Sequence, residues 1–185
     1  MNRRLFLQFP LVAGALLAAP DAGARDPKKG FMVAANRDRY EEELLFMGGR
    51  FFCKVSGKDT EGQLCIYDTV RWEKGGPALH LHQQQDEWFY VVRGQFNIRI
   101  GTESFRMGPG DCAFVPRTVP HGFVNVSEGE AQMLVLFQPA GTIETFFKEA
   151  AAMGSSVPAG QRASAAQELA RRHGMEILGP PLPLE

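Results

Sequence analysis

The sequence is poor in residues whose abundance marks several classes of protein. Its 185 residues include only 3 cysteines and 4 histidines, and 20 Lys and Arg are balanced by 21 Asp and Glu. A chain of this length can bury a core without disulfides. Because basic side chains supply most of the affinity for phosphate backbones, the lack of a basic run predicts no nucleic-acid partner. A hydrophobic content of 44% excludes a disordered chain.

Several catalytic motifs are also absent. The sequence has no Gly-x-Ser-x-Gly elbow, no Gly-x4-Gly-Lys-Ser/Thr loop and no Cys-x-x-Cys pair. It therefore gives no sign of a serine hydrolase, a phosphate-binding loop or a dithiol redox centre of these types. Any chemistry has to come from other residues.

Glycine and proline, by contrast, are abundant and divide the middle of the chain into short segments. The sequence has 20 Gly and 12 Pro. In Gln95–Ile100 polar and apolar residues alternate strictly, which places Phe96, Ile98 and Ile100 on one buried face. Short strands between turns predict an all-β barrel or sandwich. The predicted strands are Phe51–Ser56, Gln63–Val70, Ala78–His82, Trp88–Val92, Gln95–Ile100, Glu103–Met107, Cys112–Val115, Gly122–Val126 and Gln132–Phe137.

The first residues resemble an export signal. Two arginines precede the uncharged segment Leu5–Pro20, and Ala22–Ala24 offers a small-x-small cleavage site. The segment is shorter than the roughly 20 apolar residues of a spanning helix. Asn2–Gln8 resembles the twin-arginine signal, which exports folded proteins. We predict that residues 1–24 are removed, leaving a periplasmic or secreted protein without a stable membrane anchor.

The other segments flank the predicted barrel, residues 49–140. Residues 25–48 form an N-terminal arm, either a short helix or an extension lying against a neighbouring subunit. Residues 141–185 are predicted to form a helical extension with a Pro-rich tail that cannot be a helix or a central strand. The predicted helices, Ile143–Met153 and Ser164–His173, pack outside the barrel or cover an opening.

Residue types at the ends of these segments define the expected helix boundaries. Thr142 is available as N-cap of the first helix and Gly154 as the residue that ends it. The second helix opens with a Ser-x-x-Gln capping box at Ser164 and stops at Gly174. His173 is interpreted as a cation facing the negative end of that helix dipole.

The three cysteines receive no catalytic role. Cys53 and Cys65 flank a turn-like segment, so they could lie opposite each other and form a bridge in an oxidising compartment. The alternative is that both are buried apolar residues, as most free cysteines are. Cys112 is expected to be buried.

The histidines carry the predicted chemistry. His80 and His82 are two residues apart on a strand, so they point to the same side. Glu87 begins the next strand, which would return its carboxylate towards that face, and His121 follows Pro120. Three imidazoles and one carboxylate suit a first-row divalent metal with positions left for water, substrate or oxygen. The alternative, that each histidine is merely structural, leaves this spacing unexplained.

These residues resemble the two motifs of the cupin family. The first, G-x5-H-x-H-x3,4-E-x6-G, matches Gly75, His80, His82, Glu87 and Gly94, with the leading Gly one place late. The second, G-x5-P-x-G-x2-H-x3-N, is similar to the sequence from residue 110 to 125. Its matching residues are Gly110, Pro116, His121 and Asn125, with Thr118 in place of the usual Gly.

The resemblance implies a jelly-roll β-barrel with one metal inside, held by the positions of His80, His82, Glu87 and His121. The region after the barrel also resembles that of single-domain quercetin 2,3-dioxygenase-like cupins, whose C-terminal sequences are similar to residues 174–182. This resemblance implies a dioxygenase-like oxidoreductase that uses Fe, Mn, Ni or Co in preference to Zn, with O2 and an enolic or aromatic small molecule as substrates. Glu87 would then be both a metal ligand and the general base.

Aromatic residues on the strands would line the pocket or fill the core, while Trp88 and Tyr90 face outward. The pocket candidates are Tyr67, Phe89, Phe96, Phe114, Phe123 and Phe137.

Two other functions remain open from the sequence. One is a metal- or ligand-binding cupin without turnover, which differs from an oxygenase in whether an apolar pocket reaches the metal. The other is a sugar isomerase or epimerase, which would require an inward-facing cation. Arg99 and Arg106 are expected to face solvent and do not supply it. A homodimer formed across edge strands is also possible.

Overall fold

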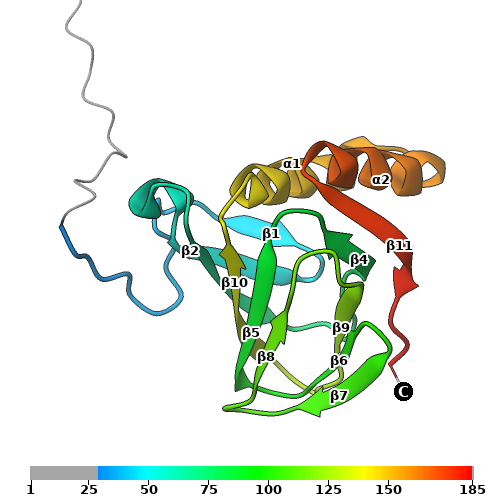
Figure 1. Cartoon of the computed structure of the whole chain (residues 1–185), viewed down its shortest axis with the longest axis horizontal. Helices are drawn as coiled ribbons and strands as arrows, with labels where there is room; N and C mark the ends of the chain where they lie inside the picture. The colour runs from blue at the N-terminus through cyan, green and yellow to red at the C-terminus, as the bar shows by residue number, and fades with distance from the viewer. Residues whose placement is uncertain (1–28, 185) are drawn as a thin grey trace, which may run out of the picture.

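Two antiparallel β-sheets enclose the core. The computed structural model describes residues 29–184, except for the side chains of residues 154 and 155. The sheets have the strand orders β1-β2-β3-β10-β5-β8 and β11-β4-β9-β6-β7, and they form the predicted jelly-roll barrel (Figure 1). The strands are β1 Leu44–Phe46, β2 Gly49–Val55, β3 Cys65–Arg71, β4 Ala78–His82, β5 Asp86–Arg93, β6 Phe96–Ile100, β7 Glu103–Met107, β8 Cys112–Val115, β9 His121–Asn125, β10 Ala131–Gln138 and β11 Met175–Pro181.

Alternation along the strands selects the side chains that fill the barrel. In β10, Met133, Val135 and Phe137 are buried, and the residues between them are partly exposed. In β6, Phe96 and Ile98 are buried as the sequence pattern predicted. These two strands therefore present one apolar face to the interior.

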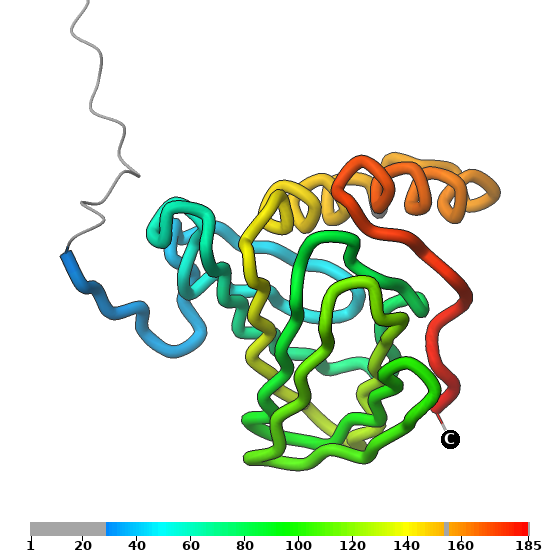
Figure 2. Tube along the Cα trace, viewed as in Figure 1, coloured from blue at the N-terminus to red at the C-terminus, as the bar shows by residue number. Residues whose placement is uncertain are grey.

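Two helices cover one end of the barrel. α1 spans Ile143–Ser156 and α2 spans Arg162–Arg172, joined by the short 3-10 helix η2, Ala159–Gln161. The chain then returns along the second sheet as β11, next to β4 (Figure 2). Phe147 on α1 and Leu169 on α2 are buried. The helices therefore cover an opening, one of the two arrangements predicted for them.

Two strands were not predicted from the sequence. β1 has three residues, too few for alternation to be visible, and pairs with β2. β11 contains Gly179 and two prolines, and it lies at the edge of its sheet, beside β4. An edge strand tolerates proline because one side makes no ladder hydrogen bonds. The Pro-rich tail is thus neither helix nor central strand, but the C-terminal extension contains a strand as well as helices.

The arm before β1 contains no helix in its described part, from residue 29, so that alternative was wrong. It packs against the chain's own barrel instead. Both Nε and Nη2 of Arg39 donate to the carboxylate of Asp59, at 3.0 and 2.5 Å. Asp38 accepts a hydrogen bond from the backbone of Cys53 at 2.6 Å. Asp59 lies in the 3-10 helix η1, Gly57–Thr60.

The predicted helix ends were partly wrong. α1 starts at Ile143, but Thr142 makes no side-chain capping bond. The helix continues past Gly154 to Ser156 and is capped by Val157, just before a proline. α2 begins at Arg162, because η2 leads directly into it, so Ser164 lies inside the helix and forms no capping box. Gly174 has a φ of 72° and follows α2, as predicted.

The three cysteines are free thiols. Cys53 and Cys65 are both buried, and hydrogen bonding to Cys65 together with burial raises the pKa of Cys53. The bridge considered from the sequence is therefore not formed. Cys112 is exposed, contrary to expectation, because it lies on the outer face of the edge strand β8, opposite Tyr90.

The predicted export segment, residues 1–24, lies outside the described residues. Among residues 29–184, no helix is long and apolar enough to cross a membrane. The outer face of β5 exposes Trp88 and Tyr90, as expected from their alternation with Phe89. The homodimer stays a prediction.

Candidate metal centre and substrate cavity

Three histidines and one glutamate converge inside the barrel. His80 and His82 lie on β4, His121 begins β9, and Glu87 lies on β5 of the opposite sheet. β4 and β9 are paired with His80 opposite His121, and the two ring centroids are 4.4 Å apart. One donor atom from each of the four residues lies within 4.8 Å of all the others. The structure therefore brings together the four residues that the sequence singled out.

The fourth histidine, His173, is not part of the cluster. It is the C-cap residue of α2, at the helix end where the sequence placed it. Its Nδ1 lies 2.9 Å from Oγ1 of Thr142, and its Nε2 lies 3.6 Å from a carboxylate oxygen of Glu149. His173 thus links the two helices over the barrel.

The cluster is buried, so a negative charge within it needs a partner. Glu87 is 4% exposed, and it alternates with the buried Phe89 and Val91 on the inner face of β5. Moving an isolated carboxylate from water into a protein interior costs several kcal/mol. The charge of Glu87 therefore requires a protonated imidazole or a metal ion beside it.

Each imidazole is oriented by a hydrogen bond at Nδ1. His80 and His121 donate from Nδ1 to the carbonyl oxygens two residues before them, at 2.8 and 3.0 Å. His82 donates from Nδ1 to Oε1 of Gln85 at 3.1 Å. Because these oxygens accept, Nδ1 carries the proton in each ring. Nε2 is then the nitrogen available for a metal.

The hydrogen bonds and charges within the cluster shift the pKa values. Nε2 of His121 and of His82 lie 2.7 and 3.2 Å from the same carboxylate oxygen of Glu87. Burial acts to raise the pKa of Glu87, but hydrogen bonds from the two histidines hold it below its usual value. Burial acts to lower the pKa of His121, but Glu87 outweighs it and raises that pKa. Burial lowers the pKa of His80 to about 3.

This donor set fits a single divalent metal ion. Metal–ligand bonds of about 2.1 Å place adjacent donors about 3 Å apart and opposite donors about 4.2 Å apart. The contacts of Glu87 with His121 and His82 are 2.7 and 3.2 Å, and the whole set lies within 4.8 Å. A cation would replace the proton that His121 shares with Glu87. The cluster of His80, His82, Glu87 and His121 could therefore hold one metal.

Gln85 is a supporting residue that sequence reasoning missed. It lies in the turn between β4 and β5. Its Oε1 accepts from His82, and its Nε2 donates to the carbonyl oxygens of Ala140 and Pro139 at 2.6 and 3.2 Å. These donor bonds fix the orientation of the amide. Through these hydrogen bonds, Gln85 couples the orientation of the His82 ring to the backbone of residues 139 and 140, which lead into α1.

We expect Gln85→Leu to weaken metal binding by about 10- to 100-fold, because His82 loses the acceptor that orients its ring. Gln85→Glu keeps an acceptor for His82 and should lose less affinity. Gln84→Leu, at the exposed neighbouring position, is the control. Metal affinity is measured by competition with a chromophoric chelator. Wild-type affinity in Gln85→Leu would contradict this role.

Thr118 adopts the conformation expected of the glycine that it replaces. Its φ is 66°, in the left-handed region that glycine enters without penalty. Its backbone N–H donates to the carbonyl oxygen of His82 at 2.7 Å. The turn therefore keeps its form, and His121 still reaches the cluster.

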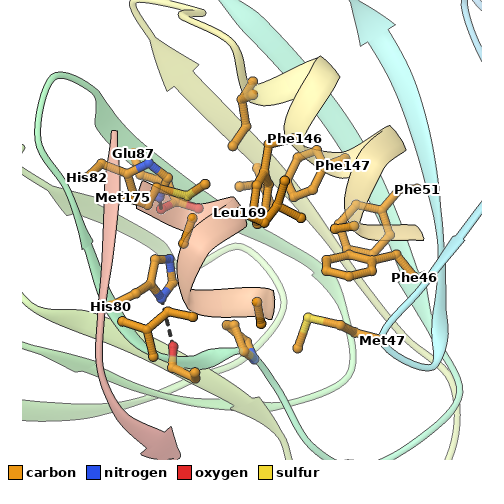
Figure 3. Close-up of a pocket in the computed structure, with 18 of the residues that line it drawn as sticks. Phe46, Met47, Phe51, His80, His82, Glu87, Phe146, Phe147, Leu169 and Met175 are labelled. Atoms are coloured by element: carbon orange, nitrogen blue, oxygen red, sulfur yellow. Dashed lines mark hydrogen bonds and ion pairs between the residues drawn. The ribbon is translucent and has the colours of Figure 1, made fainter. Parts of the chain in front are cut away.

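An apolar cavity of about 300 Å³ extends from the cluster to the two helices. Figure 3 shows His80, His82 and Glu87 on one side and Phe46, Phe51, Phe146 and Phe147 on the other. α1 and α2 therefore supply one wall of the cavity as well as covering the barrel. A largely preformed apolar cavity with a few convergent polar groups is typical of a small-molecule site.

The predicted pocket aromatics divide into three groups. Phe123 and Phe137 line the cavity, whereas Tyr67, Phe89 and Phe96 are buried core residues. Phe114 was predicted wrongly, because it is exposed on β8 and packs against Trp88 with ring centroids 4.5 Å apart. The aromatic wall on α1 was missed, since an apolar stripe on a helix does not show what it packs against.

One arginine also lines the cavity. Arg99 and Arg106 lie outside it, as predicted, with Arg106 bonded to Gln95. Arg71 was overlooked because the predicted strand ended one residue before it. Continuing the alternation of Tyr67 and Thr69 in β3 would have placed it on the inner face.

Comparisons with known proteins agree with this fold. Residues 69–137 match the cupin domain family. An uncharacterized protein of Streptomyces coelicolor is 38% identical over 55 residues, which cover 30% of this chain and 51% of that protein. The quercetin 2,3-dioxygenase of Bacillus subtilis is 25% identical over 109 residues, covering 58% of this chain and 32% of the enzyme. The matched part of this chain thus covers about half or less of the length of these two relatives.

A solved structure, KdgF from Halomonas sp., has a TM-score of 0.51 with 21% identity, covering 60% of this chain and 94% of that one. At this identity the likeness concerns the fold alone. Fold and site together define a small jelly-roll barrel with an interior cluster of three histidines and a glutamate. Residues 69–137 are thus a cupin domain, and the fold of the described residues agrees with it.

Proposed function

We propose that this chain is a metal-dependent oxidoreductase that acts as a dioxygenase on an enolic or aromatic small molecule. The observation that carries the proposal is the apolar cavity of about 300 Å³ that reaches His80, His82 and Glu87. The partial similarity to a quercetin 2,3-dioxygenase supports it. Aromatic side chains along the cavity would hold the ring of such a substrate.

The proposed ligands are His80, His82, Glu87 and His121, and the proposed metal is Fe, Mn, Ni or Co in its divalent form. Nitrogen and oxygen donors of this kind suit these ions. When bound, the metal would act as a Lewis acid on a substrate oxygen and lower its pKa.

The chain's own groups would handle the substrate proton. Hydrogen bonds from His121 and His82 hold the pKa of Glu87 below its usual value, which favours the ionised carboxylate. A carboxylate that moves off the metal could then accept the proton of a substrate hydroxyl. The apolar lining around it excludes water. Glu87 is therefore the proposed catalytic base.

A cupin that binds a ligand without turnover is the alternative that shares the same residues. The cavity favours an enzyme over a bare metal carrier, because an apolar chamber beside the cluster serves a small molecule. For the isomerase alternative, Arg71 does supply an inward-facing cation. A sugar is still a poorer fit, since its hydroxyls require many polar partners and this lining is mainly aromatic and aliphatic.

The test is oxygen uptake by protein reloaded with each metal in turn, using flavonols and the enol forms of 1,2-diketones. We expect uptake with at least one metal, and its loss in Glu87→Gln at equal metal content. Lys148→Gln, at a surface pair with Glu42, is the control. No uptake with any metal and substrate would favour the binding alternative.

We also propose export through the twin-arginine route, supported by the sequence Asn2–Gln8. Fusing residues 1–30 to a reporter should place it outside the cytoplasm. Replacing both Arg3 and Arg4 with lysine should abolish export. Unchanged export of the double variant would contradict the proposed route.

A further inference from the structure

Arg71, the last residue of β3, places a guanidinium group in the wall of the cavity that His80, His82 and Glu87 also line. The residue is 2% exposed. Its side chain lies on the same face of β3 as that of Thr69, two residues earlier, which also lines the cavity. The cation is therefore inside the barrel and not at its rim.

Arg71 has few partners for its hydrogen-bond donors. Nη2 donates to the carbonyl oxygen of Met47 at 2.6 Å. Nε is buried without a hydrogen-bond partner among the described residues. Arg71 forms no ion pair with a carboxylate within residues 29–184, although the charge of Glu73 acts on it from farther away. Burial lowers the pKa of Arg71 to about 10, so it remains a cation at neutral pH.

A purely structural role does not account for this arrangement. One hydrogen bond to Met47 uses a small part of a group that has five N–H donors. Desolvating a cation costs several kcal/mol unless a negative partner compensates, and an unpaired donor adds to this cost. The ring of Phe123, whose centroid is 5.6 Å from Cζ, offers only a weak cation–π contact. Among the described residues, the guanidinium therefore has no anionic partner on the side that faces the cavity.

We infer that Arg71 binds a carboxylate of the substrate, so that the ligand is an aryl or alkyl carboxylic acid that also carries an enol or phenol oxygen. The enol or phenol oxygen of this ligand rests on the proposed function, whereas its carboxylate rests on the surroundings of Arg71 alone. A guanidinium can engage a carboxylate through two parallel N–H donors. The apolar walls would surround the body of the ligand.

The charges of the site agree with this substrate class. A divalent metal with neutral imidazoles and Glu87 has a net charge of +1, which one ionised enol or phenol oxygen would balance. Arg71 adds a second positive charge, which one carboxylate would balance. A phosphate group usually requires more donors and charge than a single guanidinium in an apolar wall supplies.

The probe is phenylpyruvate, which has an aromatic ring, an enol form and a carboxylate, compared with its uncharged methyl ester. Binding is measured by calorimetry without oxygen, on metal-loaded and metal-free protein. We expect wild type to prefer the acid, and Arg71→Gln to weaken acid binding by about 30-fold or more while changing ester binding by less than about 3-fold. Arg71→Lys keeps the charge and should weaken acid binding by less.

Arg99→Gln, on the outer side of the barrel, is the matched control and should leave both affinities unchanged. Equal binding of acid and ester to wild type overturns the proposal, as does an equal loss of both in Arg71→Gln. If Arg71→Gln fails to fold, the proposal is tested by the affinity of Arg71→Lys for the acid and by the preference of wild type for the acid over the ester. A preference for the acid without any oxygen uptake would refute the proposed reaction but support the carboxylate site.

Discussion

His82→Ala is expected to remove bound metal while leaving the barrel folded. The substitution deletes one of four donors, and the affinity should fall by more than the roughly 10- to 100-fold loss that follows removal of a supporting hydrogen bond. The side chain faces the cavity and hydrogen-bonds Gln85, and Glu87 keeps its shorter contact with His121. Metal content should fall from about one ion per chain to about one tenth of that, measured by elemental analysis.

Chelation separates loss of the site from loss of the fold. A ligand that binds only the native state stabilises it, so wild type should melt at a lower temperature after its metal is removed. The melting temperature of His82→Ala should be the same with and without chelator. His173→Ala, which removes the histidine outside the cluster, should keep the metal. Stoichiometric metal in His82→Ala would show that the cluster is not a metal site.

The barrel could be predicted because its strands obey simple alternation. Ala78–His82, Glu103–Met107 and Cys112–Val115 were predicted with the bounds that the structure has. Gly and Pro residues mark the ends of these segments, except at His82, where a polar run follows. The three-residue β1 and the proline-containing β11 carry no such pattern. Their strand geometry depends on the partner strands, which a sequence does not show.

The metal ligands could be predicted because local rules determine where they point. A spacing of two places His80 and His82 on one face of a strand, whatever the rest of the fold. The contribution of Gln85 could not be derived, because its partners Pro139 and Ala140 are more than fifty residues away. The N-terminal arm could not be placed for the same reason. The position of Arg39 depends on its ion pair with Asp59, a residue distant in the sequence.

Gly76→Ala is expected to cause the largest loss of stability among these variants. A Cβ atom at this position would lie 1.7 Å from the carbonyl oxygen of Phe123 and 2.8 Å from its carbonyl carbon, which are backbone atoms of β9. Such an overlap cannot be relieved by rotating a side chain. The segment would have to move away from β9 and break the bridge between Gly75 and Asn125, whose two hydrogen bonds measure 3.2 and 2.9 Å.

The expected cost is about 3 kcal/mol, from two broken backbone hydrogen bonds and the exposure of the buried Asn125. In a protein of this size that corresponds to a fall in melting temperature of roughly 6–12 °C, measured by calorimetry on metal-free protein. Gly129→Ala is the control, because its added Cβ meets nothing within 4 Å, and it should change stability by less than about 0.5 kcal/mol.

Gly76→Ala should also weaken metal binding, because the displaced segment leads directly into the strand that carries His80 and His82. Gly76 thus affects the metal site through backbone packing against β9, and it is not itself a metal ligand. If Gly76→Ala melted like Gly129→Ala, the close approach of residue 76 to β9 would be wrong. The pairing of β4 with β9, which brings His80 to His121, would then need a different explanation.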